Sequence, residues 1–356
     1  MPQRWFRRHP KKLLLATGLL GLVLVLILTE LGVRVARPQW RPTTAERVDF
    51  WVYDEVLGWA HRPGEQGRFV HPEFDVDVRI NADGLRDDDY ALERTEKKRM
   101  LVLGDSFGWG FGVEHHERFS EILESRHPDW EIINASVSGY GTGQQWLYLS
   151  ERGIQYRPDV VLLLFYENDY GDIVDNEVCR YYKPYFLMGE GGLELRNVPV
   201  PTSTIKQRLE RFVYGRTWLY SKLYALLAAE DPNPYRWAPG KFVVTVEILK
   251  RMDALCREKG ARFTVVSVPM VDPKRREFLE KVCKAHGILH LALDHDFSRV
   301  RERTTFPSDR HWSRIGHRHA AKFIERFLGE MGIFDFERES RRLILGDALE
   351  RAQAPA

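Results

Sequence analysis

The pattern of apolar and polar positions divides this chain into two parts of different character. Residues 13–29 form a continuous apolar run without a charged side chain, at the short end of the length that spans a membrane as a helix. From Met100 onward, short apolar runs of strand length alternate with segments of helix length. Strands that alternate with helices predict a parallel sheet covered by helices on both faces.

The second part predicts a regular series of elements. Residues 159–166, "DVVLLLFY", form an apolar run with β-branched residues, which is typical of a central strand covered on both faces. The expected strands are residues 100–104, 131–136, 159–166, 262–269 and 288–293, and the expected helices are residues 116–126, 142–152, 241–258, 273–286 and 314–329. We therefore predict a three-layer α/β/α fold with a doubly wound, flavodoxin-like parallel sheet. Sites in such sheets lie at the carboxyl ends of the strands.

The segments around this series indicate the domain organisation. Residues 74–80, "FDVDVRI", alternate as an edge strand does, and "MGEGG" and "VPVP" break the rhythm later, before a Tyr/Trp-rich helical stretch around 205–229. We expect a cytoplasmic basic tail at residues 1–12, a membrane anchor at 13–35, a linker at 36–50, an N-terminal extension packed on the main domain at 51–98, the main domain at 99–335 with an insertion or lid at 170–240, and a C-terminal tail at 336–356.

Basic residues before the apolar run orient it in a membrane. Arg4, Arg7, Arg8, Lys11 and Lys12 precede the run, and the positive-inside bias places them in the cytoplasm and the main domain outside. A cleaved signal peptide and a buried soluble helix are the alternatives. No small-x-small cleavage pattern follows the run, so we expect an uncleaved single-pass anchor.

Composition narrows the class of protein. The chain has 356 residues, of which 44% are apolar and 29% charged, as in a folded protein with one large or two modest domains. A net charge of +2, without a long basic block outside the extreme N-terminus, argues against nucleic-acid binding. Cys179, Cys256 and Cys283 show no CxxC spacing, so at most one disulfide is expected and a zinc site built from them is not.

The stretch "GDSFGWGFG", residues 104–112, contains the first candidate for chemistry. It is not a phosphate-binding loop, because no Gly-Lys-Ser/Thr follows, and Val113 stands where a dinucleotide fingerprint needs its third glycine. Gly104, Ser106 and Gly108 match the GxSxG of an α/β-hydrolase elbow. Ser106 is therefore a candidate nucleophile, with a helix N-cap or plain turn serine as the alternative.

Partners for a nucleophilic serine occur elsewhere in the chain. Asp309 and His311 lie two residues apart in a polar turn before the last helix, where a carboxylate can orient an imidazole. "DHD" at 294–296 is a competing pair, whereas we expect His317 and His319 to cover the surface of the last helix. Gly139 and Asn168, which follow the second and third strands, are candidate donors to an oxyanion, or ordinary turn residues.

This order of motifs resembles the SGNH (GDSL) hydrolase family over roughly residues 52–330. The resemblance implies Ser106 as nucleophile, His311 and Asp309 as its base and orienting acid, and an oxyanion hole from the Ser106 and Gly139 N–H groups and the Asn168 side chain. "LGWAHRPG" and "INADGLRD" look like the lead-in of membrane-anchored bacterial members. An α/β-hydrolase is disfavoured, because its acid and histidine come from separate loops.

The motifs depart from the family pattern at two places. Tyr166 stands at the glycine of Gly-x-Asn-Asp, which would narrow the site beside Asn168. The family's last block usually reads Asp-x-x-His, with the acid three residues before the histidine. Here Asp309 lies two residues before His311, and Ser308 stands at the position three residues before it. The two-residue spacing also occurs in relatives that act on extracellular polysaccharide.

The expected function is that of a serine esterase or O-acyltransferase, without cofactor or metal, on the outer side of the bacterial cytoplasmic membrane (periplasmic or cell surface). Its expected substrates are O-acyl, first of all acetyl, groups on polysaccharide or glycan. Trp109, Tyr140 and Trp312 flank the motifs and either stack on sugar rings or pack in the core. The alternatives are a lipid-ester hydrolase and an inactive glycan-binding or assembly protein on the same fold.

Overall fold

The structure is a computed structural model that describes residues 10–36, 50–71, 73–178, 181–205, 207–209 and 240–335. Several features expected from the sequence lie outside these residues: Arg4, Arg7 and Arg8, nearly all of the linker, Cys179, most of the Tyr/Trp-rich stretch and the C-terminal tail.

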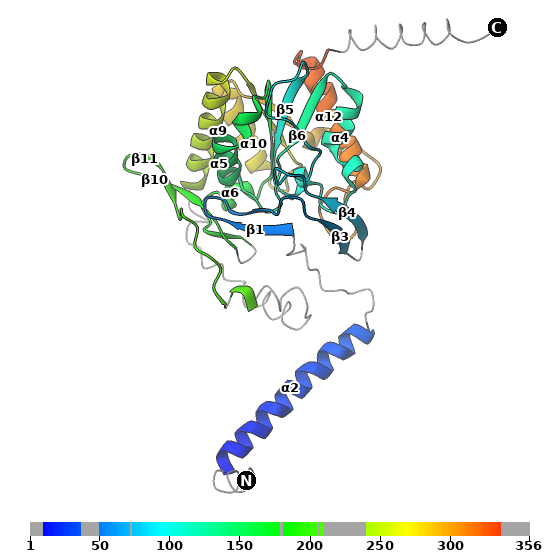
Figure 1. Cartoon of the computed structure of the whole chain (residues 1–356), viewed down its shortest axis with the longest axis vertical. Coiled ribbons are helices and arrows are strands. Elements are labelled where there is room, and N and C mark those ends of the chain that lie inside the picture. Colours follow the sequence, from blue (N-terminus) through cyan, green and yellow to red (C-terminus); the bar gives the residue numbers. More distant parts are fainter. Residues whose placement is uncertain are drawn as a thin grey trace, which may run out of the picture.

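A five-stranded parallel sheet forms the centre of the described domain (Figure 1). Its strands are β5 (Lys98–Leu103), β6 (Trp130–Asn134), β7 (Val160–Phe165), β12 (Arg262–Ser267) and β13 (Leu289–Ala292). They lie in the order β13-β12-β7-β5-β6, which confirms the predicted doubly wound topology. The winding reverses between β5 and β7, and the carboxyl ends of strands at such a switch point are where ligand sites form.

Helices cover both faces of this sheet, as the alternation predicts. Helices α5 (Thr142–Glu151), α9 (Gly240–Glu258) and α10 (Pro273–His286) pack on one face, and α4 (Phe119–Arg126), α11 (Leu293–Phe297) and α12 (Arg314–Glu330) pack on the other. Successive strand residues point to opposite faces. Leu101 and Leu103 of β5 therefore join the core under α5 and α9, while Met100 and Val102 join the core under α4 and α12.

Short elements connect these layers. They are α3 (Ser106–Trp109), the 3₁₀ turns η2 (His115–Glu117) and η3 (Gly153–Tyr156), and α6 (Asp169–Asp172). The helix expected at 116–126 is divided, because the backbone of Arg118 between η2 and α4 is extended, with φ −67° and ψ 147°. That extended residue directs the Arg118 side chain into the interior of the domain.

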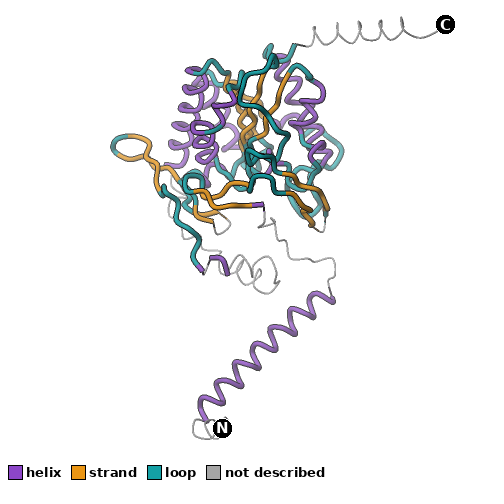
Figure 2. Tube along the Cα trace, in the orientation of Figure 1, coloured by secondary structure: helices purple, strands orange, loops and turns teal. Residues whose placement is uncertain are grey.

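The segment before β5 forms two hairpins at the carboxyl ends of the strands (Figures 1 and 2). They are β1 (Trp51–Asp54) with β2 (Gly58–His61), and β3 (Gln66–His71) with β4 (Phe74–Arg79). A separate apolar core joins Phe69 and Phe74 of the second hairpin to Trp109 and Phe111 after the first central strand, and to Phe306 near the last helix. The hairpins therefore hold together two loops that are far apart in the sequence.

The described part of residues 170–240 contains two further hairpins. They are β8 (Glu177–Val178) with β9 (Tyr181–Tyr182), and β10 (Tyr185–Gly189) with β11 (Gly192–Arg196). The β10–β11 hairpin projects from the domain in Figure 2. Phe186 of β10 packs in the core beneath α5 and α9, so this segment is anchored to the domain at its base.

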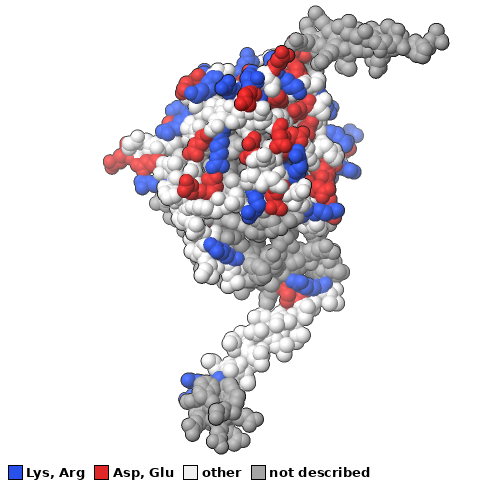
Figure 3. Space-filling model, viewed as in Figure 1, with Lys and Arg blue, Asp and Glu red and all other residues white. Residues whose placement is uncertain are grey.

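Helix α2 (Pro10–Ala36) is separate in character from everything that follows. It has 27 residues and a mean hydropathy of 2.4 over its most apolar window, and it is long and apolar enough to cross a membrane. Figure 3 shows its surface almost free of charged atoms, whereas acidic and basic side chains are interspersed over the visible face of the domain. An N-terminal helix of this kind fits a membrane span and a signal sequence alike.

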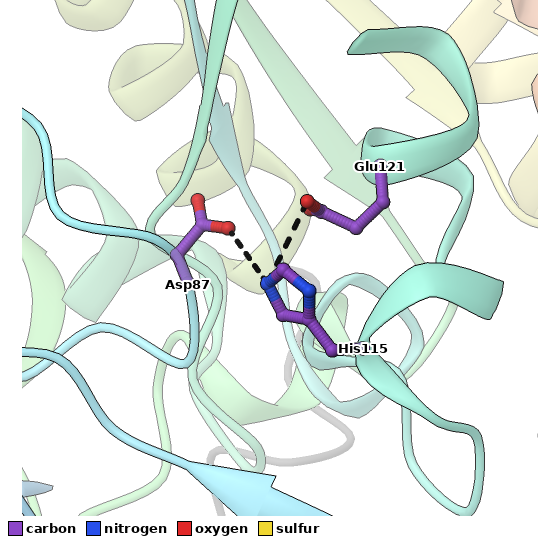
Figure 4. Close-up of side chains that lie close together, drawn as sticks. All are labelled: Asp87, His115 and Glu121. Carbon is purple, nitrogen blue, oxygen red and sulfur yellow. Dashed lines mark ion pairs between the residues drawn. The ribbon is translucent and has the colours of Figure 1, made fainter. Parts of the chain in front are cut away.

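A buried ion-pair network ties the lead-in before β5 to helix α4. The Arg118 guanidinium donates to Asp87 Oδ1 and to Glu121 Oε1, each at 2.8 Å, and the Arg118 and Asp87 side chains are fully buried. His115 Nε2 lies 3.4 Å from Asp87 Oδ1 and 3.6 Å from Glu121 Oε2 (Figure 4). These three side chains lie close enough to hold a metal ion, but the positive charge of Arg118 already pairs with both carboxylates.

Replacing Asp87 tests this network. Asp87→Ala leaves the buried Arg118 with one fewer counter-charge and removes the acceptor of the Asn134 N–H at 2.6 Å. We expect the free energy of unfolding to fall by about 3 kcal/mol or more. The measurement is urea unfolding of the full-length chain in detergent micelles, followed by tryptophan fluorescence.

The matched control is Asp88→Ala. Asp88 pairs with Arg79 at the surface, with 63% of its side chain exposed, so its loss is expected to cost about 0.5 kcal/mol or less. Equal unfolding midpoints for the two variants would contradict the assigned role of Asp87.

Candidate active site

Ser106 stands at the carboxyl end of β5, as the first residue of α3. Asp105 caps this short helix, because its carboxylate accepts the Phe107 N–H at 2.9 Å. The turn needs glycine at position 108, where a Cβ atom would lie 2.2 Å from Ser136 Oγ. The tight turn leaves Ser106 partly exposed between buried neighbours.

A hydrogen-bonded line of side chains joins Ser106 to the loop before α12. His311 Nε2 lies 2.7 Å from Ser106 Oγ, and His311 Nδ1 lies 2.5 Å from Asp309 Oδ1. The same carboxylate oxygen accepts the His311 backbone N–H at 2.7 Å. Because a carboxylate only accepts hydrogen bonds, this contact places the proton on Nδ1 and leaves Nε2 to accept from Ser106.

The electrostatics of Asp309 suit this role. Burial alone would raise the pKa of Asp309, but its hydrogen bond to His311 and the nearby imidazole outweigh burial and hold the pKa below its usual range. Asp309 is therefore ionised throughout the neutral range. The imidazole is held from the side by Phe111, whose ring centroid lies 4.3 Å away in a stacked arrangement.

The two candidate oxyanion donors follow the neighbouring strands on each side of β5. Gly139 has φ +80°, and the loop that carries it is fixed beside Ser106 by the bond from Val137 N–H to Gly104 O at 3.1 Å. Asn168 follows β7, and its Nδ2 donates to Asp172 Oδ2 at 2.7 Å. An amide nitrogen carries two N–H groups, so this bond orients the side chain and leaves a second donor.

Buried carboxyl groups lie next to Asn168. Asp169 accepts the Thr142 N–H at 2.8 Å and the Tyr166 N–H at 2.9 Å, which ties the loops after β6 and β7 together. Burial raises the pKa of Asp169 well above its usual range, and burial raises that of Asp105 to about 6. The buried ammonium of Lys183 donates to the carbonyls of Asp172 and Asp175, and it supplies positive charge beneath this cluster.

Three aromatic residues proposed from the sequence as sugar-stacking groups do not have that role. Trp109, Tyr140 and Trp312 are only 1%, 1% and 2% exposed, so the stacking prediction is wrong and the packing alternative describes them. Each ring lies near another ring in the core. The centroid distances are 5.2 Å for Trp312 and Phe107, 5.6 Å for Tyr140 and Trp59, and 6.1 Å for Trp109 and Phe69. Their neighbours in sequence reach the site, but these rings face inward.

Two further expectations about histidines are resolved by burial. His317 does not cover the surface of α12: it is 1% exposed, stacked on Phe119, and burial lowers its pKa to about 3. His319 does lie nearer the surface and pairs with Glu302 at 2.9 Å. The acids of the competing "DHD" sequence serve ion pairs, since Asp296 binds Arg326 at 2.8 Å and Asp294 lies 3.3 Å from Arg276.

Sequence reasoning missed the residues that brace the site. Buried Arg86 donates to the backbone carbonyls of Gly110 at 2.7 Å and Val113 at 2.6 Å, just after the Ser106 turn. Glu73, at the tip of the β3–β4 hairpin, accepts from Ser308 N–H at 2.8 Å and from Ser308 Oγ at 2.7 Å. Arg86 belongs to the "INADGLRD" segment that resembles the lead-in of the family. The local sequence does not show which distant loop the Arg86 side chain contacts.

Comparisons with known proteins place this geometry in context. No protein-family model and no curated protein matches the sequence. The structure is similar to that of TesA, with 13% identity, 65% of this chain and 98% of that chain covered, and a TM-score of 0.41. It is also similar to a putative lipolytic protein of the G-D-S-L family from Desulfitobacterium hafniense DCB-2, with 11% identity, 65% of this chain and 100% of that chain covered, and a TM-score of 0.40. A third similar structure is the acetyl xylan esterase AlAXEase, with 12% identity, 64% of this chain and 98% of that chain covered, and a TM-score of 0.39. At such identities and TM-scores these comparisons carry no argument about activity, which rests on the side chains described above.

Replacing Glu73 tests its hold on the loop that carries Asp309 and His311. Glu73→Ala removes both hydrogen bonds from Ser308 and lets the loop that carries His311 shift. A shift that raises the activation free energy by about 1.4 kcal/mol lowers the rate tenfold. We expect about tenfold slower labelling of Ser106 by a fluorophosphonate probe, measured on the full-length chain. Glu73→Gln retains one acceptor and is expected to lie between Glu73→Ala and the wild type.

The control for this prediction is Asp75→Ala on the same hairpin. Asp75 pairs with the exposed Arg68 and does not contact the loop before α12 through any described hydrogen bond. Its labelling rate should match the wild type. A Glu73→Ala rate equal to that of Asp75→Ala would refute the bracing role.

Proposed function

We propose that this chain, which has the fold and the motifs of the SGNH (GDSL) hydrolases, is a serine ester hydrolase that works through a covalent acyl-enzyme. The observation that carries the proposal is the line of hydrogen bonds from Asp309 through His311 to a partly exposed Ser106. A serine that is merely a turn residue has no need of an oriented imidazole from a position 205 residues away.

The reaction follows from this proton path. Ser106 Oγ attacks the ester carbonyl carbon while its proton passes to His311 Nε2, and Asp309 stabilises the imidazolium that forms. The tetrahedral intermediate collapses, and His311 Nε2 returns the proton to the departing alcohol oxygen. Water then gives a proton to Nε2 and attacks the acyl carbon, which releases a carboxylic acid and restores Ser106.

The negative charge that develops on the carbonyl oxygen needs fixed donors. We assign the Ser106 and Gly139 backbone N–H groups and the Asn168 side chain to this role. They follow three adjacent parallel strands, whose carboxyl ends meet at one edge of the sheet. The Asp172 bond fixes the Asn168 amide before substrate arrives, which avoids reorganisation during the reaction.

The substrate we propose is an O-acyl group, first of all acetyl, on an extracytoplasmic polysaccharide. The apolar helix α2 and the basic residues before it favour an anchor whose following domain lies outside the cytoplasmic membrane. A domain held there meets cell-surface and secreted glycans. A sugar hydroxyl in place of water would make the same acyl-enzyme a transferase.

Removal of the nucleophile is the direct test. The full-length chain and its Ser106→Ala variant are compared by p-nitrophenol release from acetate, butyrate and octanoate esters. We expect release that requires Ser106 and that falls as the acyl chain lengthens. Equal release from folded wild type and variant would refute the esterase, and release that rises with chain length would favour lipid esters over acetylated glycans.

Replacing Asn168 tests the oxyanion assignment. Asn168→Ala removes one donor, and we expect kcat for p-nitrophenyl acetate to fall by about 10²- to 10³-fold with little change in KM. Ser150→Ala is the control and is expected to leave both constants unchanged. Within the described part of the chain, the Ser150 hydroxyl donates to Leu147 O of its own helix α5. A rise in KM at constant kcat would instead assign Asn168 to ground-state binding.

A further inference from the structure

A cavity of about 210 Å³ opens between the first hairpin and the segment after β11. The aromatic residues Trp51, Tyr53, Trp59 and Tyr181 form one part of its wall, and Ser203 and Arg208 contribute to the other. The site described above uses none of these six side chains. Tyr53 is 47% exposed, and Arg208 is exposed as well, so the cavity is open to ligands.

One residue of this wall also contacts the loop that carries a proposed oxyanion donor. The Trp59 indole N–H donates to Ser138 O at 3.2 Å, and Tyr140 OH donates to Trp59 O at 2.5 Å. A Cβ atom at Gly139 would lie 3.3 Å from the Trp59 ring. Trp59 therefore both lines the cavity and contacts the loop at Gly139.

The chemistry of the wall decides between two kinds of occupant. An acyl chain needs a wall that is apolar all round, because polar groups that face it lose their hydrogen bonds to water. A sugar ring offers apolar C–H faces to aromatic rings and hydroxyl groups to polar side chains. Trp51 and Trp59 are only 7% and 5% exposed, so Tyr53 and Tyr181 offer the accessible aromatic surface. Together with Ser203 and Arg208 they make a mixed wall that matches a sugar ring.

The size of the cavity limits the occupant further. Pockets that enclose drug-sized ligands measure roughly 300–1,000 Å³. A cavity of about 210 Å³ fits one ring and not a chain of rings, so the rest of a polymer would extend into solvent past Tyr53.

We propose that this cavity is a subsite for one sugar ring of the polysaccharide whose acylated residue is presented to Ser106. The inference rests on the proposed function and names how that function selects its substrate. The ester reacts at Ser106, and a second sugar unit of the same chain is held against the exposed ring of Tyr53. The N-terminal hairpin thereby belongs to the substrate site as well as to the core.

Turnover of short and long substrates tests the subsite. The full-length chain in detergent micelles is given chemically O-acetylated cellotetraose, xylotetraose and mannotetraose, each beside its acetylated monosaccharide. We expect wild type to favour at least one tetrasaccharide over its monosaccharide in kcat/KM. Tyr53→Ala is expected to remove about three- to tenfold of that preference and to leave p-nitrophenyl acetate unchanged.

Tyr53→Phe is the matched variant. The Tyr53 hydroxyl bonds to Val200 O, and both variants lose that bond, but only Tyr53→Ala loses the ring. We expect Tyr53→Phe to retain the tetrasaccharide preference. Loss of the preference in both variants would make Tyr53 a structural residue and would overturn the subsite.

A binding measurement separates failure of the subsite from failure of the proposed chemistry. Quenching of tryptophan fluorescence by the three unacetylated tetrasaccharides is measured on the Ser106→Ala chain, which requires no turnover and uses Trp51 and Trp59 as reporters. Saturable quenching that Tyr53→Ala weakens supports the subsite even when no ester is hydrolysed. The absence of quenching overturns the subsite. So does equal kcat/KM for each tetrasaccharide and its monosaccharide when wild type turns both over, or an effect of Tyr53→Ala on p-nitrophenyl octanoate alone.

Discussion

The hydrogen bond between His311 Nε2 and Ser106 Oγ joins two residues that are 205 positions apart, and the arrangement of the domain serves to make it. Ser106 is fixed by the end of the β5 strand, and His311 by a loop that enters α12 on one face of the same sheet. A contact of 2.7 Å tolerates little movement of either loop. The layers between them therefore have to pack as one rigid core, with the β5 side chains buried on both faces.

The N-terminal extension supplies the rigidity that the sheet alone does not. Loops at the carboxyl ends of strands have few neighbours of their own, and both parts of this site lie on such loops. Arg86 holds the carbonyls after the Ser106 turn, Glu73 holds Ser308, and Phe74 packs between Phe111 and Phe306. The extension is thus an additional layer across the carboxyl ends of the strands, and it also lines the cavity beside Trp59.

Buried carboxylates at the carboxyl ends of the strands hold the backbone of the site loops, because they accept backbone N–H groups. Burial raises the pKa of Asp105 and Asp169, and the negative charges of neighbouring carboxylates raise both pKa values further. Backbone N–H donors and the buried Lys183 ammonium offset this cost. By contrast, Asp309 is partly exposed and paired with His311, which keeps it ionised where an orienting charge is required.

The sequence by itself determined the sheet and its helices, because these depend on local pattern: apolar runs of strand length that alternate with segments of helix length. It proposed Ser106, Asp309 and His311 as a set from the order of distant motifs, and the tertiary structure brings their side chains together. The sequence did not determine which aromatic rings face solvent, since Trp109, Tyr140 and Trp312 stand beside motif residues and yet point into the core. Nor did it reveal Glu73, the buried His317 or the Trp59 cavity. Those features depend on which distant surfaces pack together, and only the tertiary structure decides that, because burial and long-range contacts leave no periodic trace in one chain.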